Sequence, residues 1–317
     1  MTDQAKAYAA IFAQATIIGF SYLATKVALR AAGAVDLLAF RFAIAALGAV
    51  LVNAFFVKER VVWNRATLRR IAPLALLYPI AFFFCQTTGL KYIPSADAGA
   101  ISAITPLFAV LFARFLLNER PGGKQIGFML LAVAGVAGIN AQNGLNFAEG
   151  GMYMAGSALI IASAAALGAY NAALKKAAVT AGPFAFAYIL NILGFVFFAC
   201  LDALLRLRQG TLRRCLEPLA EPSFVPAALF LGLLSSLVTT LLLSYGLRRV
   251  EAGKAGVITG FSTVVAVFAG VAFLGETLSA GDWACIAAIL IGGRRIQCAA
   301  DALLRQTDQG GRTMKTL

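Results

Sequence analysis

Few residues in this chain could perform acid–base or nucleophilic chemistry. The sequence contains no histidine, which excludes a Ser-His-Asp triad, the common zinc-protease motif and a histidine proton relay. Its five cysteines show no CxxC pair and no shared spacing, so we predict neither a disulfide framework nor a metal site. The 14 Asp and Glu residues all lie in polar segments or within a few residues of the end of an apolar stretch. We therefore expect no catalytic residues, no metal ion and no cofactor.

Arg41 is the charged residue that stands out, because it lies inside an apolar stretch, about six residues from the start of segment 35–57. A charge at membrane depth costs a few kcal/mol even on lenient scales. We expect Arg41 to anchor the helix bundle. One alternative is contact with an anionic group of a bound molecule. Another is snorkelling to the interface, since six residues at a rise of about 1.5 Å each place it only about 9 Å deep.

Uncharged polar and aromatic residues within the apolar stretches are the other candidates, because hydrocarbon does not solvate polar groups. Several recur at helical spacing, as Tyr78, Phe82 and Gln86 do. The candidate cavity residues are Gln14, Ser21, Thr25, Tyr78, Phe82, Gln86, Ser102, Thr105, Tyr170, Asn171, Thr240, Ser244, Tyr245, Thr259 and Ser262. Each hydroxyl alone is more simply explained by a bond to its own helix. For Gln86, Tyr170 and Asn171, a cavity wall and an interhelix hydrogen bond explain the residue equally well.

These residues sit in a very apolar chain. Hydrophobic residues make up 61% and charged residues 13%, with a mean hydropathy of +0.83, whereas a soluble domain is nearer half apolar and a quarter charged. The apolar residues form blocks of about the 20 residues that cross a bilayer. We predict ten spans, at 8–29, 35–57, 71–90, 96–117, 125–141, 152–174, 183–205, 224–247, 252–274 and 282–300. The net charge of +13 does not predict a nucleic-acid partner, since the basic residues lie at span ends.

The fourth and ninth spans belong to an internal repeat. Residues 89–119 align without a gap to residues 246–276, a shift of 157 positions, with nine identities among 31 positions. Both copies carry small residues four apart, a spacing that lets membrane helices approach closely. We expect the two spans to meet, and we assign structural roles to Gly99, Glu119, Gly256, Gly260 and Glu276, with Arg41 as an anchor. Each Glu closes its span, where the helix dipole disfavours a carboxylate, so each should have a partner such as a basic residue or the N-terminus of the following helix.

A weaker match, Gly19–Gly33 with Gly168–Gly182, extends the repeat. We therefore predict an all-α polytopic membrane protein with ten transmembrane helices in two inverted five-helix repeats. The expected boundaries are 1–148, 149–300 and a cytoplasmic tail at 301–317. With the N-terminus in the cytoplasm, 19 of the 27 Lys and Arg residues face inside, seven face outside and Arg41 is left over. This bias favours cytoplasmic termini in the cytoplasmic membrane.

Two prolines within spans, Pro79 and Pro106, predict kinks, because each removes a backbone donor. Thr263 stands opposite Pro106 in the repeat, so any hinge there is expected in one half only.

Together, the ten short spans, the Gly/Ala-rich span that ends in LLNE and again in FLGE, and the FRFAIAAL segment at residues 40–47 resemble the EamA-type permeases of the drug/metabolite transporter superfamily. The segment GLKYIPSADAGAISAITPLF is similar to the third-to-fourth-span turn of that family. The resemblance implies a solute carrier with a central cavity lined mainly by spans 1, 3, 4, 6, 8 and 9. The small four-helix relatives carry a membrane-embedded Glu in span 1, where this chain has Gln14.

We accordingly expect a secondary transporter, an exporter or facilitator, of small organic metabolites such as amino acids, working by alternating access. The alternatives are a non-transporting scaffold or lipid- or sterol-binding protein, and an intramembrane enzyme. The expected partners are a small-molecule substrate and the lipid bilayer, with no nucleic acid and with monomer and homodimer both open. Because no carboxylate lies at mid-depth in the sequence, we expect the solute's own gradient to drive transport.

Overall fold

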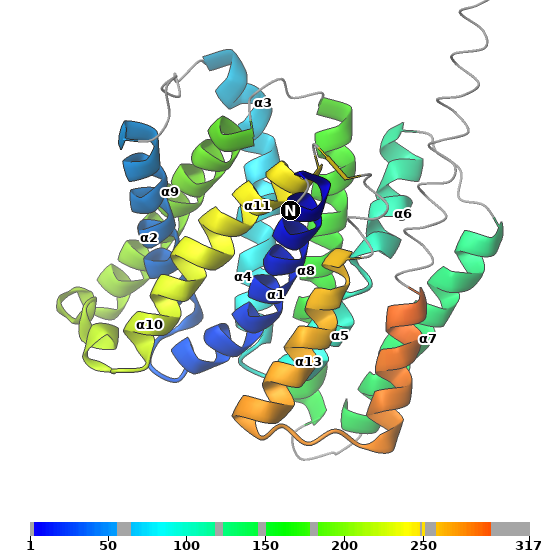
Figure 1. Cartoon of the computed structure of the whole chain (residues 1–317). Coiled ribbons are helices and arrows are strands. Elements are labelled where there is room, and N and C mark those ends of the chain that lie inside the picture. The colour runs from blue at the N-terminus through cyan, green and yellow to red at the C-terminus, as the bar shows by residue number, and fades with distance from the viewer. Residues whose placement is uncertain are drawn as a thin grey trace, which may run out of the picture.

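Apolar helices that run up and down through the molecule make up nearly all of the structure (Figure 1). It is a computed structural model that describes residues 3–55, 65–117, 123–144, 150–177, 183–247, 249–250 and 258–292. In this part of the chain, eight helical segments are long and apolar enough to cross a membrane. The same part of the chain also contains two shorter apolar helices, Phe261–Leu274 and Ala280–Gly292. The prediction of a polytopic all-α protein is confirmed.

The first half holds five of these segments. Three are single helices, α1 (Asp3–Ala28), α2 (Ala34–Phe55) and α7 (Gly123–Gly144). The third predicted span is built from α3 (Arg65–Ala75), the π-helical segment η1 (Leu76–Ala81) and α4 (Phe82–Gly89). The fourth is divided into α5 (Ser95–Ser102) and α6 (Thr105–Leu117).

The second half repeats this plan. Its first two spans are α8 (Gly150–Ala177) and α9 (Pro183–Gln209), followed by the short 3₁₀ turns η2 (Leu212–Arg214) and η3 (Glu217–Ala220). The eighth span comprises α10 (Phe224–Leu229), the π-helical η4 (Phe230–Val238) and α11 (Thr239–Leu247). The ninth is α13 (Phe261–Leu274) and the tenth is the Ala280–Gly292 helix. Gly256, Glu119 and the predicted tail 301–317 lie outside the described residues.

Glycine contacts reveal the internal repeat in three dimensions. A Cβ on Gly19 of α1 would come 2.5 Å from the Val265 side chain of α13, and one on Gly168 of α8 would come 2.6 Å from Phe108 of α6. Gly19 and Gly168 are equivalent in the weaker match, and Phe108 and Val265 are equivalent in the stronger one. The first span of each half therefore packs against the fourth span of the other half.

A second glycine pair gives the same result. Gly89 of α4 packs against Ile160 of α8, whereas its repeat partner Gly246 packs against Ile11 of α1. Spans 4 and 9 themselves meet where Gly99 leaves room for Ala266, 2.5 Å from the position of its missing Cβ. Figure 1 shows α5 and α6 rising while α13 descends, so the two spans are antiparallel, as an inverted repeat requires.

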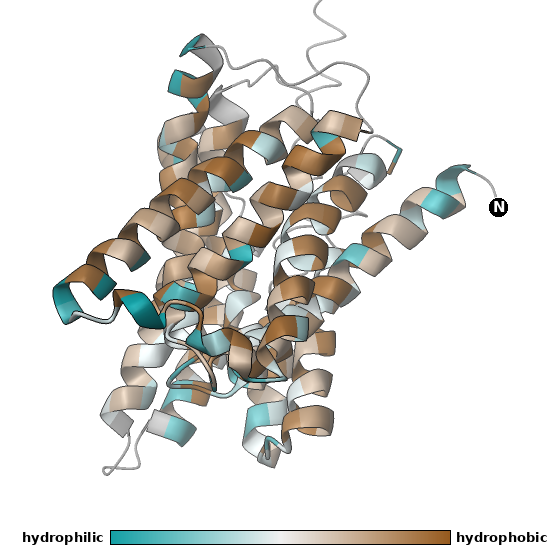
Figure 2. Cartoon of the chain, turned by 90° about the vertical axis from the view of Figure 1, so that its left-hand side faces the viewer, coloured by the Kyte–Doolittle hydropathy of each residue, from teal (hydrophilic) through white to brown (hydrophobic). Residues whose placement is uncertain are grey.

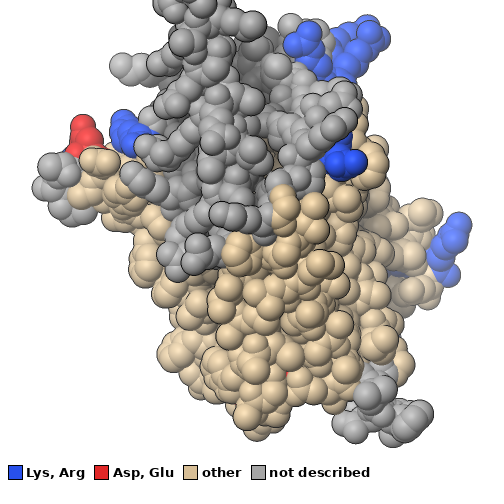
Figure 3. Space-filling view, turned by 90° about the vertical axis from the view of Figure 1, so that its right-hand side faces the viewer, with Lys and Arg blue, Asp and Glu red and all other residues tan. Residues whose placement is uncertain are grey.

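The outer surface suits a bilayer. Figure 2 shows hydrophobic residues over the middle of the helices and hydrophilic ones mainly near their ends. On the face seen in Figure 3, Lys and Arg side chains gather toward the upper end and the edges, and a broad uncharged area lies between. The loop between α9 and α10 lies on the side of the molecule opposite the N-terminus (Figure 1), where the symmetric ten-span arrangement places it.

Candidate functional site

Spans 3 and 8 each contain a π-helical segment, and the two segments occupy related positions. The 157-residue shift of the repeat, extended back along the chain to η1, pairs it with residues 233–238, the second part of η4. Such segments widen a helix and often mark functional positions in helices. Within η1, Tyr78 has a non-helical backbone (φ −142°, ψ 118°) next to Pro79. The kink predicted at Pro79 is confirmed.

Spans 4 and 9 are both interrupted. Ala103 and Ile104 separate α5 from α6, and their N–H groups bond three residues back, to the carbonyls of residues 100 and 101. Gly260, the repeat equivalent of Ala103, separates α13 from two preceding helical residues. Ala103 (φ −67°, ψ −7°) and Gly260 (φ −58°, ψ −19°) keep right-handed helical dihedrals, so each interruption is a local turn within its span. The expectation that any hinge beside Pro106 would be asymmetric stays a prediction. Broken helices that face each other are where inverted-repeat transporters bind their solutes.

Arg41 is fully enclosed by spans 2, 3 and 8, with only 2% of its surface exposed. Its Nε donates to Ser236 Oγ and its Nη2 to Ser235 Oγ, both at 3.0 Å. Its guanidinium lies 4.0 Å from the centre of the Phe83 ring, a cation–π distance. Among the described residues, no carboxylate pairs with it. Arg41 therefore does not snorkel to an interface, and it joins α2 to the π-helical part of span 8.

Aromatic candidates gather next to Arg41. The Tyr78 ring lies 5.1 Å from the Tyr170 ring of α8 and 5.4 Å from the Phe82 ring. Phe82 and Tyr170 are buried. These three candidates, from spans 3 and 6, thus come together as one aromatic cluster beside the buried guanidinium.

Three candidates in α1 are also buried. Ser21 Oγ donates to the Ile18 carbonyl at 2.6 Å, and Thr25 Oγ1 donates to the Ser21 carbonyl at 2.7 Å, so both hydroxyls are satisfied by their own helix. Gln14 is only 2% exposed, and its Oε1 has no hydrogen-bond partner in the described structure. Gln14 is therefore the α1 candidate with unused bonding capacity.

Gln86 connects span 3 to span 1. Its Nε2 donates to the Tyr22 hydroxyl at 3.1 Å, and both side chains are buried. Tyr22 was not a candidate, because nothing in its apolar neighbourhood distinguishes a tyrosine that packs from one that bonds to another helix. This hydrogen bond links α1 to α4 one helical turn before Lys26 and Leu90.

Two candidates, Ser102 and Thr105, lie next to the interruption in span 4, and both are half-buried. Thr259 and Ser262 lie next to the interruption in span 9 and are also half-buried. Thr105 Oγ1 donates to the Ser102 carbonyl at 2.7 Å, which is a local bond.

The remaining candidates are dispersed. Thr240 Oγ1 donates to the Ser236 carbonyl at 2.9 Å, and Tyr245 lies 4.1 Å under the guanidinium of Arg249. Asn171 is exposed, and the side chain of Ser244 lies outside the described residues.

The structure contains a hollow of about 440 Å³. It lies where α1, α4 and α13 end, and its lining residues are Lys26, Leu29, Arg30, Leu90, Lys91, Leu274 and Glu276. None of the candidate cavity residues is among them. Three cations and one carboxylate give this hollow a positive balance, and its size is within the range of small-molecule sites.

Glu276 caps the first turn of α5. Its carboxylate accepts the N–H groups of Ser95 at 2.7 Å and Ala96 at 2.8 Å, together with the Ser95 hydroxyl at 3.0 Å. A negative charge is favourable at a helix N-terminus. Glu276 thus has a partner, as expected, and that partner is a helix N-terminus. The helix is not the following one, which was the example given, but α5 of the other half. Gly270 leaves room for this cap, since a Cβ there would displace the Glu276 carboxylate.

Next to this cap, four polar side chains from four helices meet. Tyr153 of α8 donates to Asp97 Oδ2 at 2.7 Å. Asn143 of α7 donates to Asp97 Oδ2 at 3.4 Å and to Asp282 Oδ1 at 3.2 Å. Asp97 is 1% exposed and Asp282 4%. The sequence places both carboxylates at span ends, but neighbouring helices cover them.

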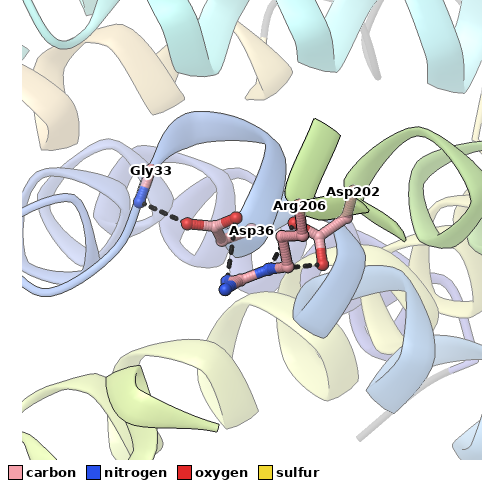
Figure 4. Close-up of polar contacts among 4 residues, drawn as sticks. All are labelled: Gly33, Asp36, Asp202 and Arg206. Carbon is pink, nitrogen blue, oxygen red and sulfur yellow. Dashed lines mark hydrogen bonds and ion pairs between the residues drawn. The ribbon is translucent and has the colours of Figure 1, made fainter. Parts of the chain in front are cut away.

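A separate ion cluster joins spans 2 and 7 (Figure 4). Arg206 of α9 bonds to Asp36 Oδ1 of α2 at 3.0 Å and to Asp202 Oδ2 at 3.0 Å. The other Asp36 oxygen accepts the Gly33 N–H at 3.0 Å. The cation thus lies between two carboxylates and holds the ends of the two spans together.

Comparison with known proteins places these features in a family. The model of the EamA-like transporter family matches twice, at residues 5–141 and 154–293. The chain is 38% identical over 295 residues to the uncharacterized transporter YcxC of Bacillus subtilis (strain 168), with 92% of each chain covered. It is 26% identical over 194 residues to the uncharacterized transporter YetK of the same organism, covering 59% of this chain and 54% of YetK.

One solved crystal structure has the same fold. It aligns with a TM-score of 0.55 at 21% sequence identity, covering 95% of this chain and 99% of its own. The two family matches fall on the two halves defined by the repeat. The family resemblance inferred from the sequence is confirmed, and this multi-pass membrane transporter belongs to the EamA-like transporter family.

Proposed function

We propose that this protein is a secondary transporter that exports or equilibrates small organic metabolites, such as amino acids, by alternating access. The observation that carries the proposal is the matched interruption of spans 4 and 9, at Ala103 and Gly260. An antiparallel pair of interrupted helices with polar residues beside each break supplies backbone groups for a solute. The same pair can open toward either side by tilting one half against the other.

The charges that line the hollow support a polar solute with an anionic group. Lys26, Arg30 and Lys91 line the hollow, and their charges exceed that of Glu276, whose carboxylate is already bound by the first turn of α5. Cationic side chains of this kind bind carboxylates through charge-assisted hydrogen bonds. The hollow of about 440 Å³ accommodates a molecule of amino-acid size.

The proposed orientation places both termini in the cytoplasm and the protein in the cytoplasmic membrane. The excess of Lys and Arg on the N-terminal side supports this orientation. The hollow, which lies where α1 ends, would then face outward, and the Tyr22–Gln86 hydrogen bond would separate it from the interior.

The test is a metabolite-release screen with cells that do or do not express the protein. Expression should raise the external concentration of particular metabolites without creating a new compound. Gln86→Leu removes the donor to Tyr22 and should change the release rate. Gln4→Leu makes the same substitution at an exposed position of α1 and should not.

Unchanged metabolite release in expressing cells would count against transport. A compound absent from control cells would instead support an intramembrane enzyme.

A further inference from the structure

Asp97 is the buried carboxylate whose bonds are least complete. Its Oδ2 accepts the Tyr153 hydroxyl and the Asn143 amide, but its Oδ1 has no hydrogen-bond partner among the described residues. The residue is 1% exposed, so water does not solvate that oxygen from the surface. A buried charged oxygen without a partner is costly. A proton on Oδ1 would remove the charge.

Asp282, in the same cluster, shows what a satisfied carboxylate looks like here. Its Oδ2 accepts the Ser279 N–H and the Ser279 hydroxyl, each at 2.9 Å, and its Oδ1 accepts Asn143 at 3.2 Å. Both oxygens are therefore bonded. One amide, Asn143, serves the two carboxylates, and two like charges held this close disfavour each other.

The charged and titratable groups around Asp97 come from several of the elements that surround it. Tyr153 lies on α8, Asp282 on the Ala280–Gly292 helix, Glu276 on the loop before that helix and Lys26 on α1. Asn143 of α7 adds a donor but no charge. Three carboxylates thus face one ammonium group. Lys26 and Glu276 also line the hollow, so two of the charged groups that interact with Asp97 belong to its lining.

We propose that Asp97, held by Tyr153 and Asn143 between α5, α7 and α8, is a proton-binding site. A proton from water in the hollow forms an O–H bond with Asp97 Oδ1, and the carboxylate becomes a neutral acid. The O–H bond breaks when the site faces the other side, and the proton returns to water there. No other bond changes.

The consequence for transport rests on the proposed function. If one half rocks against the other, the proton and the solute share the hollow and its ammonium group, Lys26, so movement of one is linked to movement of the other. This site cannot be expected from the sequence, because Asp97 lies near the start of a span. Its burial by neighbouring helices removes the ground for expecting a simple facilitator.

A bound metal ion is a poorer explanation of the cluster. No three His, Cys, Asp or Glu side chains in the described part of the chain come close enough together to hold one. A single bare oxygen next to a hydroxyl and an amide suits a proton better than a divalent cation, which needs several oxygen ligands.

The first experiment is infrared difference spectroscopy on the purified full chain in lipid, titrated from about pH 8 to about pH 5. It needs no transported solute. The carbonyl band of a protonated buried acid should appear in the wild type and in Asp282→Asn, and it should be lost in Asp97→Asn. Tyr153→Phe should keep the band but change the pH at which it appears. No band, or a band that persists in Asp97→Asn, would overturn the proposal.

The second experiment measures coupling in liposomes that contain a pH-sensitive dye, with an equimolar mixture of L-amino acids as the probe. In the wild type, solute movement should carry protons. Asp97→Asn should lose proton movement and keep solute-for-solute exchange. Solute flux with no proton movement, or a requirement for sodium instead, would overturn the coupling. An Asp97-dependent infrared band without solute flux would support the proton site while refuting the proposed function.

Discussion

Two groups of charged residues on the side opposite the N-terminus differ in whether a cation bonds to their carboxylates. At the ends of spans 2 and 7, the Arg206 guanidinium lies between two carboxylates, Asp36 and Asp202 (Figure 4). Asp36 bonds to the guanidinium through one oxygen and to the Gly33 N–H through the other. Near the start of span 4, two buried carboxylates share one amide, and Asp97 Oδ1 is bare.

This difference in bonding indicates that the buried Asp residues of the two groups serve different purposes. The first group is called the balanced cluster below, because its cation bonds to both of its carboxylates, and such bonded ion pairs suit a fixed contact. An unbalanced buried cluster can lower its free energy by taking up a positive charge, so it responds to its surroundings. Arg206 supplies that charge permanently in the first group. We infer that a proton supplies it reversibly in the second.

The largest expected effect comes from removing the cation of the balanced cluster. Arg206→Leu leaves Asp36 and Asp202 facing each other without a counter-charge and should lower the unfolding free energy by about 2–4 kcal/mol. Thermal unfolding of the purified protein in detergent would show this as a midpoint lowered by several degrees. Arg206→Lys retains the charge but not the forked geometry, so its loss should be smaller. Equal midpoints for the wild type and Arg206→Leu would show that this cluster holds nothing together.

Removing one carboxylate of the balanced cluster should have an intermediate effect. Asp202→Asn leaves Arg206 Nε one uncharged acceptor in place of the two carboxylate oxygens that now bond to it at 3.1 and 3.0 Å. We expect a loss of about 1–2 kcal/mol, as for a hydrogen bond to a charged group. The same thermal measurement would check it, with the exposed residue Glu221 changed to Gln as the control. A loss no greater than that of the control would contradict the assigned role.

Tyr153→Phe should have a smaller effect, because it removes one neutral donor from the unbalanced cluster. Asp97 Oδ2 would keep only the longer bond from Asn143. We expect a loss of about 1 kcal/mol in thermal unfolding. Tyr92→Phe, at an exposed tyrosine, is the matched control and should leave the midpoint unchanged. A larger loss than in Asp202→Asn would mean that the Tyr153 bond is a main structural contact.

The sequence predicted the fold well, because span length and the small-residue repeat are local patterns that survive in the structure. Gly99 does lie where spans 4 and 9 meet. Arg41 stood out as a charge in an apolar segment, but its partners Ser235 and Ser236 depend on the π-helical turn that brings them to it. Asp97 was missed for a different reason. Its distance from the span end can be read from the sequence, but its burial cannot, because three other helices pack over it.

The smallest expected effect on stability is the most informative. Asp97→Asn has the shape of the neutral acid, and its carbonyl oxygen can still accept the Tyr153 hydroxyl. The atom it replaces, Oδ1, bonds to nothing among the described residues, so no hydrogen bond is lost. We therefore expect thermal unfolding within about 0.5 kcal/mol of the wild type. Asp202→Asn makes the same change in the balanced cluster and costs more. If Asp97→Asn instead lost as much as Asp202→Asn, Asp97 would be an ionised structural residue, and the contrast between the two clusters would fail. An unchanged midpoint with lost proton movement would assign Asp97 to transport, because a residue that only held the fold together would affect both measurements.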